Sequence, residues 1–277
     1  MKAASDCYQC LRRLVYQAAE LATSDAQLRA KAIEEGLKLV ERDFSYDVIT
    51  ITIATEIHKA VKEITGNPDP YRGMKDEEIR VSRELCRRIS PAQDFRSLLQ
   101  LSVLGNSMDF FRGAETIKGD LEKPVKFALD DADRFEQKLG NATEVLYLAD
   151  NTGEVFFDLP LIRWMERSVK VTYVVKEAPA ADDITFEDLR RCGLEGELER
   201  VITTGTATPG VILSQASEEF KRELESADLV LAKGMGYYEA LSELPSDGRM
   251  LFCFMAKCKP VADSLGVPLH SYVAMMW

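Results

Sequence analysis

The chain has 277 residues, 46% of them apolar and 29% charged, and its formal net charge at pH 7 is −11. This composition is ordinary for a globular protein of one large domain or two modest ones, and the acidic balance disfavours a general nucleic-acid binder, which is usually basic. No apolar run reaches the roughly 20 residues that span a bilayer, and residues 1–14 lack the apolar core of a signal peptide. We therefore expect a cytoplasmic protein with no membrane contact.

The first 140 residues predict helices, because apolar residues recur there at helical spacing. The apolar sets of the expected helices are Leu11, Leu14, Val15, Ala18 and Leu21; Leu28, Ala32, Leu37 and Val40; Ile53, Ile57, Val61 and Ile64; Leu98, Leu101 and Leu104; and Val125, Ala128, Leu129, Ala132 and Phe135. Ser24 and Gln27 have the spacing of a capping box, and Ser90 is placed to cap the fourth helix. Gly66 and Gly140 are expected to end the third and the last helix.

From residue 145 onward, short β-branched or apolar runs alternate with helical stretches, which implies βαβ units and a parallel sheet. The expected strands are Val145–Ala149, Val171–Val175, Val201–Thr203, Leu229–Ala232, Leu251–Phe254 and Val267–Leu269. We therefore predict an α/β fold in two parts. A helical N-terminal domain of residues 1–140 packs on a Rossmann-like C-terminal domain of residues 141–277 that has a mainly parallel sheet.

The cysteines and histidines limit the possible metal chemistry. Six sparse cysteines without a secretion signal disfavour a disulfide scaffold. Cys7 and Cys10 form one C-x-x-C pair, and a structural zinc site would need Cys86 and Cys258 to complete its four ligands. Packing of buried thiols on the N-terminal helix is the favoured interpretation. His58 falls on an expected helix, where a structural role is favoured over a ligand role.

Polar residues follow the first expected strand, where an open parallel sheet binds its ligands. Asp150 and Asn151 come directly after this strand, and Glu154 begins the next helix. Carboxylate and amide oxygens suit hard divalent cations, and the N-terminus of the helix favours a phosphate. A polar turn with an N-cap residue explains the same residues equally well, so a ligand site and a structural turn both stay open.

Acidic residues also follow the second strand. Asp182 and Asp183 precede Thr185 after Lys176 ends the strand. They are placed either to complete a carboxylate cluster with Asp150 or to cap the next helix, and the motif by itself favours capping.

Lysines and glycines follow the strands that end near residues 232 and 254. Lys233 and Lys257 stand at strand ends, where an ammonium group is well placed to meet a phosphate. Gly234 and Gly236 allow backbone amides to approach a ligand closely. The alternatives are a tight turn and solvated lysines.

A polar break in the helical part adds one more candidate. Asn106 and Asp109 interrupt an otherwise apolar helix, and they either reach toward the site or bond to backbone. Most of the expected strand ends carry groups that suit a metal or a phosphate. This coincidence is stronger evidence for a ligand site than any one motif.

Taken in order, these residues resemble the metal-dependent damage-control phosphatases, long known as a domain of unknown function, in their compact prokaryotic and archaeal branch. The motifs are Cys7-x-x-Cys10, Asp69-Pro70-Tyr71, Gly105-Asn106-x-x-Asp109, Asp150-Asn151-x-Gly153-Glu154, Asp183-x-Thr185, Lys233-Gly234-x-Gly236-x-Tyr238-Glu239 and Lys257-Cys258. The resemblance implies a divalent cation (manganese, cobalt, nickel or magnesium) and hydrolysis of phosphate monoesters of small metabolites, such as sugar phosphates or damaged phosphometabolites.

The resemblance also implies roles for single residues. By motif match, the metal ligands and catalytic residues are Asp150, Asn151 and Asp183. The residues that line the substrate phosphate site are Asn106, Glu154, Lys233, Gly234 and Lys257. Two positions depart from the family pattern, which usually has asparagine in place of Tyr237 and of Asp182; the first departure bears on substrate contacts and the second on metal preference.

The phosphatase interpretation implies a mechanism, and two alternative functions stay open. A cation would act as a Lewis acid while Lys233 and Lys257 neutralise phosphate oxygens. The nucleophile is either a metal-bound water or Asp150, which would form an aspartyl-phosphate. The rivals are an adenosylmethionine-dependent methyltransferase, suggested by the turn after Val145–Ala149, and a non-catalytic sensor of phosphometabolites or metals. The oligomeric state, the preferred metal and the physiological substrate leave no trace in the sequence.

Overall fold

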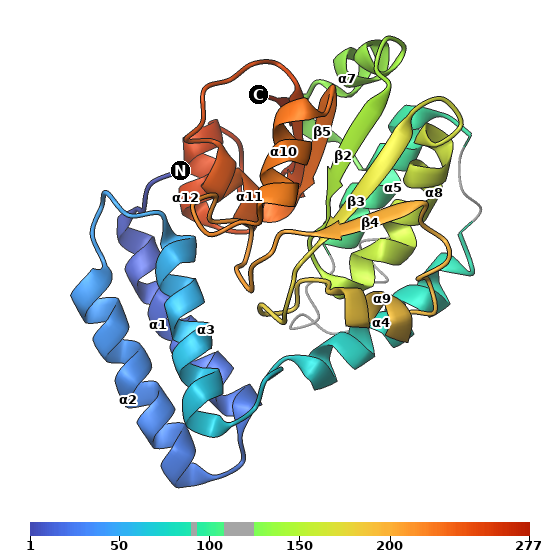
Figure 1. The fold of residues 1–277 in the computed structure, drawn as a ribbon. Helices are drawn as coiled ribbons and strands as arrows, with labels where there is room; N and C mark the ends of the chain where they lie inside the picture. Colours follow the sequence, from blue (N-terminus) through green and yellow to red (C-terminus); the bar gives the residue numbers. More distant parts are fainter. Residues whose placement is uncertain (90–92, 108–124) are drawn as a thin grey trace.

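The computed structural model describes residues 1–89, 93–107 and 125–277. Three helices, α1 (Ser5–Ala22), α2 (Ala26–Asp43) and α3 (Thr50–Thr65), pack together as a bundle that lies below the rest of the molecule (Figure 1). Helix α4 (Arg72–Cys86) leads from this bundle toward the sheet. Among the described residues, no helix is long and apolar enough to cross a membrane.

Seven strands form one sheet within the described residues, in the order β1-β7-β6-β5-β2-β3-β4. Their bounds are β1 Phe127–Asp130, β2 Glu144–Leu148, β3 Lys170–Val175, β4 Arg200–Thr203, β5 Leu229–Lys233, β6 Met250–Met255 and β7 Tyr272–Met276. Strands β2 to β6 run parallel, whereas β7 is antiparallel to β6 and parallel to β1. The mainly parallel sheet expected from the sequence is therefore confirmed.

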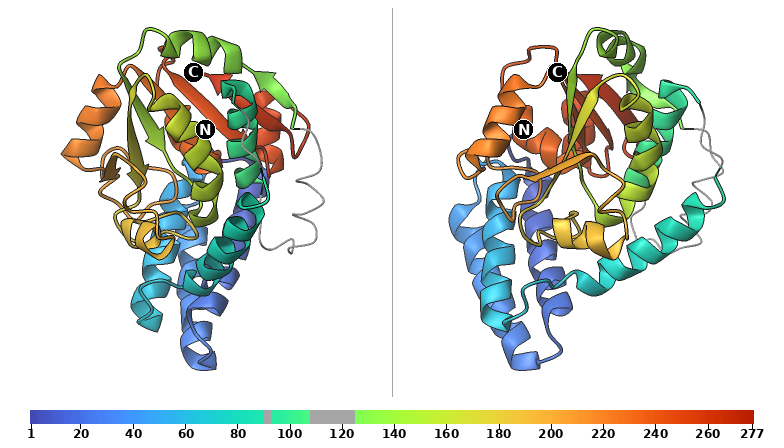
Figure 2. Two further views of the ribbon diagram at one scale, coloured as in Figure 1. Left: turned by 90° about the vertical axis from the view of Figure 1, so that its right-hand side faces the viewer. Right: turned by 45° about the vertical axis from the view of Figure 1, so that its right-hand side comes forward.

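Helices cover both faces of the sheet (Figure 2). The remaining elements are α5 Phe95–Asn106, α7 Ala132–Leu139, the short 3-10 helix η2 Thr152–Glu154, α8 Val155–Met165, α9 Phe186–Arg191, α10 Glu218–Ser226, α11 Gly234–Leu241 and α12 Lys259–Leu265. Residues of α5, α7, α8 and α9 share one apolar core with the sheet, and residues of α10, α11 and α12 share the core on the opposite face.

Alternation along the strands builds these two cores. In β2, Val145 and Tyr147 belong to the first core, whereas Leu146 and Leu148 belong to the second, because successive side chains of a strand point to opposite faces. The Tyr147 ring stacks on that of Tyr173 in the neighbouring strand, with 5.4 Å between ring centroids. A strand buried on both sides therefore reads as one continuous apolar run.

The order of the strands creates a switch point. From β2 the chain adds β3 and β4 on one side, and it then returns to add β5 and β6 on the other side. The carboxyl ends of β2 and β5 are therefore adjacent, at the place where helices leave toward opposite faces. In open α/β sheets, this is where ligands bind.

Two expected elements were wrong, and both concern the end of the sheet formed by β1 and β7. The apolar set from Val125 to Phe135 predicted one helix, but the structure has strand β1 followed by α7. The expected strand Val267–Leu269 is a loop, and the last strand is β7 instead. Gly266, with a φ of 66°, ends α12, and Pro268 has no N–H to donate to a ladder, so residues 267–269 cannot continue a strand.

A helix cap also differs from the expectation. Asp25, not Ser24, caps α2: its Oδ1 accepts from the backbone N–H groups of Gln27 and Leu28 at 2.8 and 3.1 Å. Gly66 ends α3 with a φ of 69°, as expected. The expected cap at Ser90 lies outside the described residues.

The domain boundary at residue 140 stays a prediction, but the packing favours a boundary earlier in the chain, before α5. Phe95 of α5 stacks on Phe135 of α7, and both lie in the core beneath the sheet. The α1–α3 bundle has a separate core that includes Val15, Val40 and Ile57. The packing thus groups α5, β1 and α7 with the sheet rather than with the bundle.

His58 on α3 supplies a test of this fold. Its Nδ1 has no hydrogen-bond partner, and its ring meets the edge of Tyr71 at a centroid distance of 5.5 Å. Burial, assisted by the nearby Lys62 charge, lowers the pKa of His58 to about 4. Because an unfolded histidine takes up its proton near pH 6.5, the unfolded state binds more protons between these values, and stability falls as the pH falls.

We therefore expect His58→Phe to lose part of this pH dependence. Between pH 7 and pH 5, wild-type stability should drop by about 2 kcal/mol more than that of His58→Phe, measured by urea unfolding at each pH. His270→Asn, at an exposed histidine, is the matched control and should follow the wild type. Parallel pH profiles for the wild type and His58→Phe would contradict the assignment.

Candidate active site

Asp150 and Gly234 meet at the switch point of the sheet. Asp150 follows β2, and Gly234 follows β5 with a φ of 82°. A Cβ atom built on Gly234 would lie 2.0 Å from Asp150 Oδ2. Only glycine therefore lets the Asp150 carboxyl group lie directly against this backbone.

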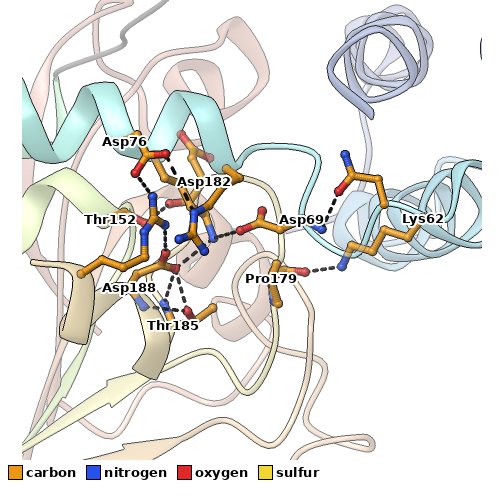
Figure 3. Close-up of polar contacts among 12 residues, drawn as sticks. Lys62, Asp69, Asp76, Thr152, Pro179, Asp182, Thr185 and Asp188 are labelled. Carbon is orange, nitrogen blue, oxygen red and sulfur yellow. Dashed lines mark hydrogen bonds and ion pairs between the residues drawn. The ribbon is translucent and has the colours of Figure 1, made fainter. Parts of the chain in front are cut away.

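The loop after β3 folds back onto the segment that follows β2. Thr152 N donates to the Asp182 carbonyl at 2.9 Å, and Ile184 N donates to the Asp150 carbonyl at 2.9 Å. Thr152 Oγ1 also donates to the Asp182 carbonyl (Figure 3). Asn151 and Asp183 thereby form an isolated antiparallel bridge. The three residues expected to bind metal come together through this backbone pairing.

Asn106, the second-to-last described residue before the gap that follows α5, links three elements. Its Nδ2 donates to Asp150 Oδ2 at 2.8 Å and to Glu154 Oε1 at 2.7 Å, and its Oδ1 accepts from Met255 N at 3.0 Å. The sequence left open whether Asn106 reaches the site or bonds to backbone, and it does both. Asp109 lies outside the described residues.

Lys233 points into the protein. Its ammonium group donates to the Ser102 carbonyl at 3.0 Å, to Glu154 Oε2 at 2.8 Å and to Asp158 Oδ1 at 2.9 Å. Burial lowers the pKa of Lys233, but the Asp158 and Glu154 carboxylates outweigh it and raise the pKa above its ordinary value. All three donors have protein partners, so this geometry favours a lysine that positions Glu154 over one that holds a phosphate.

Lys176, at the end of β3, was not among the expected site residues. Its buried ammonium group donates to Tyr237 Oη at 2.9 Å and to the Gly210 carbonyl, and it lies 3.2 Å from Asp183 Oδ2. It also lies 4.1 Å from the centroid of the Tyr237 ring. Tyr237, which departs from the family pattern, thus acts as a partner of this lysine. A lysine directly after a buried strand, at the edge of the sheet where ligands bind, was the signal that could have revealed it.

A charged cluster joins α4 to the loop that carries Asp183. Lys75 lies 3.0 Å from Asp188 Oδ2, and Asp188 accepts from Thr185 and Arg191 (Figure 3). Thr185 caps α9, the helix that follows the loop, and Asp188 completes the capping box by accepting from Thr185 N. This cluster ties the loop to α4.

A glycine of the turn after β2 permits close packing of α4. Gly153 N donates to Glu78 Oε2 at 3.3 Å, and a Cβ on Gly153 would lie 2.7 Å from Ser82 Oγ. Glu78 is buried beside the site, although no sequence pattern had singled it out.

Excess negative charge is concentrated at this edge of the sheet. Burial, with the neighbouring Glu154 and Asp183 carboxylates, raises the pKa of Asp150 well above its usual range, while Lys257 opposes the shift. Burial raises the pKa of Asp183 to about 6, against the opposing charge of Lys176. Burial likewise raises the pKa of Glu78. A bound cation would relieve this repulsion.

The donor set fits a hard divalent cation. Asp150, Asn151 and Asp183 offer two carboxylates and one amide, and the buried Asp183 Oδ2 has the Lys176 ion pair but no hydrogen bond. Within residues 1–89, 93–107 and 125–277, no group of three or more His, Cys, Asp or Glu side chains is arranged to hold a metal. The candidate set has only two such residues, because its third member is an amide.

The cysteines are free thiols in the described residues. Cys7, Cys10 and Cys258 line one cavity, whereas Cys86 packs against the apolar cluster around Phe157. This separation does not support the four-cysteine zinc site that the sequence left as an alternative.

The fold and site together define an α/β enzyme with a polar, acidic centre at the switch point of its sheet. A sequence model of the damage-control phosphatase ARMT1-like domain matches residues 3–273. A damage-control phosphatase from Archaeoglobus fulgidus is 34% identical over 99% of each chain. Damage-control phosphatase PH1575 from Pyrococcus horikoshii is also 34% identical, over 99% of this chain and 98% of its own.

A solved structure agrees with the sequence relatives. The crystal structure of a DUF89 family protein, PH1575 from Pyrococcus horikoshii, superposes with a TM-score of 0.89 at 31% identity, covering 100% of this chain and 99% of that one. The chain therefore belongs to the damage-control phosphatase family, and the phosphatase predicted from its motifs is confirmed. The methyltransferase alternative is set aside by the same findings.

The position of Lys233 generates a prediction that separates its two possible roles. Lys233→Met removes one member of a buried cluster, so we expect a loss of about 3–5 kcal/mol in the free energy of unfolding. Lys170→Met, at a lysine whose side chain is 80% exposed, is the control and should cost less than about 1 kcal/mol. Unchanged stability together with a higher KM would instead assign Lys233 to phosphate binding.

The contact between Gly234 and Asp150 generates a second prediction. Gly234→Ala should push the Asp150 carboxyl group away and lower kcat/KM for phosphate release roughly a hundredfold, because a shift of about 1 Å at a site has that effect. Gly66→Ala is the matched control, since Gly66 has a similar φ of 69° but nothing within 4 Å of the added Cβ. Equal kcat/KM in the two variants would show that the close approach has no role.

Proposed function

We propose that this phosphatase hydrolyses phosphate monoesters of small metabolites, such as sugar phosphates or damaged phosphometabolites, with a divalent cation held by Asp150, Asn151 and Asp183. The observation that supports the proposal is the backbone pairing of residues 150–152 with 182–184, which brings these two segments side by side next to the switch point. Relatives named damage-control phosphatase cover the whole chain and support the substrate class.

The family consists in general of metal-dependent phosphatases, and manganese, cobalt, nickel and magnesium are the candidate ions. When bound, such an ion supplies Lewis-acid stabilisation of charge on a phosphate oxygen. The side chain of Asp182, beside Asp183, brings an additional negative charge where the family usually has a neutral asparagine. This charge favours tighter cation binding at the site.

The residues around the proposed ligands position them and balance their charge. Asn106 donates to both Asp150 and Glu154, and Lys233 occupies the second oxygen of Glu154, so Glu154 is held in place by its neighbours. Lys257 is half-buried and acts electrostatically on Asp150 and on Asp182. We assign to Lys257 the neutralisation of a phosphate oxygen, and to Lys233 the support of Glu154.

Two nucleophiles fit this arrangement. Attack by a water molecule leaves Asp150 as a ligand throughout, whereas attack by Asp150 forms an aspartyl-phosphate that water then hydrolyses. Trapping of a phosphorylated protein from a rapidly quenched reaction would select the second route. A cytoplasmic location and the absence of nucleic-acid partners stay predictions from the sequence.

The proposal predicts phosphate release that depends on metal. Metal-stripped protein should release phosphate from an aryl phosphate and from a panel of sugar phosphates only after manganese, cobalt, nickel or magnesium is restored. Asp150→Ala and Asp183→Ala should each lower kcat by a factor of roughly a thousand or more, because each removes a proposed ligand, with urea unfolding of each variant as the check that the protein is folded in the assay.

Asp182→Asn is the matched control, since it restores the residue usual in the family beside Asp183. It should keep kcat and require a higher metal concentration for half-maximal activity, because one negative charge is lost. Release without metal, or full activity in both alanine variants, would contradict the proposed site.

A further inference from the structure

A cavity of about 480 Å³ lies between the α1–α3 bundle and the carboxyl edge of the sheet. Its walls come from α1, α3, the first turn of α11 and residues 257–260. Gly236, which lines it, is two residues from the Gly234 that contacts Asp150. Lys257 also lines it, and its backbone N–H donates to Sδ of Met235, the residue directly after Gly234, at 3.3 Å. The cavity therefore opens beside the candidate site.

The walls of this cavity are mainly apolar. They include Leu11, Leu14, Ile51, Met235 and Leu269. The polar groups among them are partly engaged by neighbours: Thr50 donates to Glu239, and Lys259 pairs with Asp263 outside the lining. Besides these groups and Lys257, the exposed Asp6 and Arg13 are the other charged groups of the lining.

This lining discriminates between two kinds of organic group. Each sugar hydroxyl that is buried without a partner costs roughly 1–3 kcal/mol, so a hexose would bind poorly among leucines. An alkyl or aryl group instead gains from every apolar Å² removed from water. The cavity therefore favours an apolar substituent on the phosphate.

A second cavity, of about 630 Å³, lies on another side of α3 and is polar. Lys59, Lys62, Thr206 and Thr208 are among its lining residues, and Lys62 donates to the Pro179 carbonyl. Among the described residues, no hydrogen bond or ion pair links this lining to the three proposed metal ligands. Gly236 and Lys257, which lie near the strand ends that carry the site, line the apolar cavity instead.

Resting on the phosphatase function proposed above, we propose that the preferred substrates are phosphate monoesters of an apolar alkyl or aryl group that fills the cavity beside Lys257. The phosphate end would lie at Lys257 and the proposed cation site. The apolar end would contact leucines of α1 and of the loop before β7. Sugar phosphates would be poor substrates in comparison.

The test compares chain lengths in two assays. With the most active metal, kcat/KM is measured for n-alkyl phosphates from ethyl to octyl and for glucose 6-phosphate. Binding of n-alkylphosphonates, which have no ester bond to hydrolyse, is measured by calorimetry on metal-loaded protein. We expect kcat/KM to rise and Kd to fall by up to roughly fourfold per methylene. Octyl phosphate should exceed glucose 6-phosphate in kcat/KM.

Variants of the cavity wall test whether the increase in kcat/KM per methylene comes from contacts in this cavity. The double variant Leu14→Gln, Leu269→Gln places amides in its wall, at one half-buried and one 48% exposed position, so the fold should tolerate both. We expect the gain per methylene to fall below about twofold in this variant. Leu21→Gln, at a 37% exposed leucine of the same helix α1 outside the lining, is the control and should match the wild type.

The outcomes separate this inference from the proposed function. Hydrolysis with no dependence on chain length, or with sugar phosphates preferred, would overturn the inference and leave the metal-dependent phosphatase in place. An unchanged gain per methylene in the double variant would also overturn it. Phosphonate affinity that grows with length without hydrolysis of any ester would support the cavity assignment and overturn the proposed function.

Discussion

Three buried lysines hold the acidic edge of the sheet together. The side chains of Lys75, Lys176 and Lys233 are fully buried, and each forms an ion pair with at least one buried carboxylate. Removing such charges from water is costly, and the arrangement is stable only because partners surround each of them. They come from α4, from the end of β3 and from the end of β5, so they tie the segments around the site to one another.

These lysines compensate only part of the negative charge. Lys233 neutralises Glu154 and Asp158 behind the site, and Lys176 lies beside Asp183. Asp150, at the switch point, has no ion pair among the described residues, and burial with neighbouring carboxylates raises its pKa. Asp150 is thus held by its neighbours, but no lysine or arginine in the described part of the chain neutralises it through an ion pair. This shortage of positive charge favours binding of a cation.

The bundle of α1 to α3 completes the site from the other side. Thr50 at the start of α3 donates to Glu239 of α11, and the N-terminal amine donates to the carbonyl of the same glutamate. These contacts hold the bundle over the carboxyl edge of the sheet, and the apolar cavity lies between them. The sheet therefore supplies charge and metal-compatible ligands, whereas the bundle supplies much of the wall that a substrate's organic group would contact.

Local patterns in the sequence determined much of this protein. Strands β2, β3, β5 and β6 were evident because a strand buried on both faces is a continuous apolar run. The partly exposed β4 was evident from its β-branched residues. The positions of Asp150, Gly234 and Lys257 followed from the rule that ligands bind beyond the carboxyl ends of parallel strands. The tertiary structure decided which way side chains at those ends point. Lys233 turns inward because it binds two buried partners, Ser102 and Glu154. These partners lie 131 and 79 residues away in the chain, so no local pattern could predict the contact.

The same reason explains the other differences. β1 is an edge strand, where partial burial weakens the apolar pattern and a helix fits the same residues. β7 lies between β1 and β6, and its pairing with β1 joins segments far apart in the chain. Lys176 gained its role only when the loop after β3 folded back to bring Asp183 to it and Tyr237, which follows β5, met it from a distant segment. Periodicity records which face of an element is buried, so the sequence by itself determined the elements and the strand ends. Contacts between distant segments have no such local signature, and only the tertiary structure decided them.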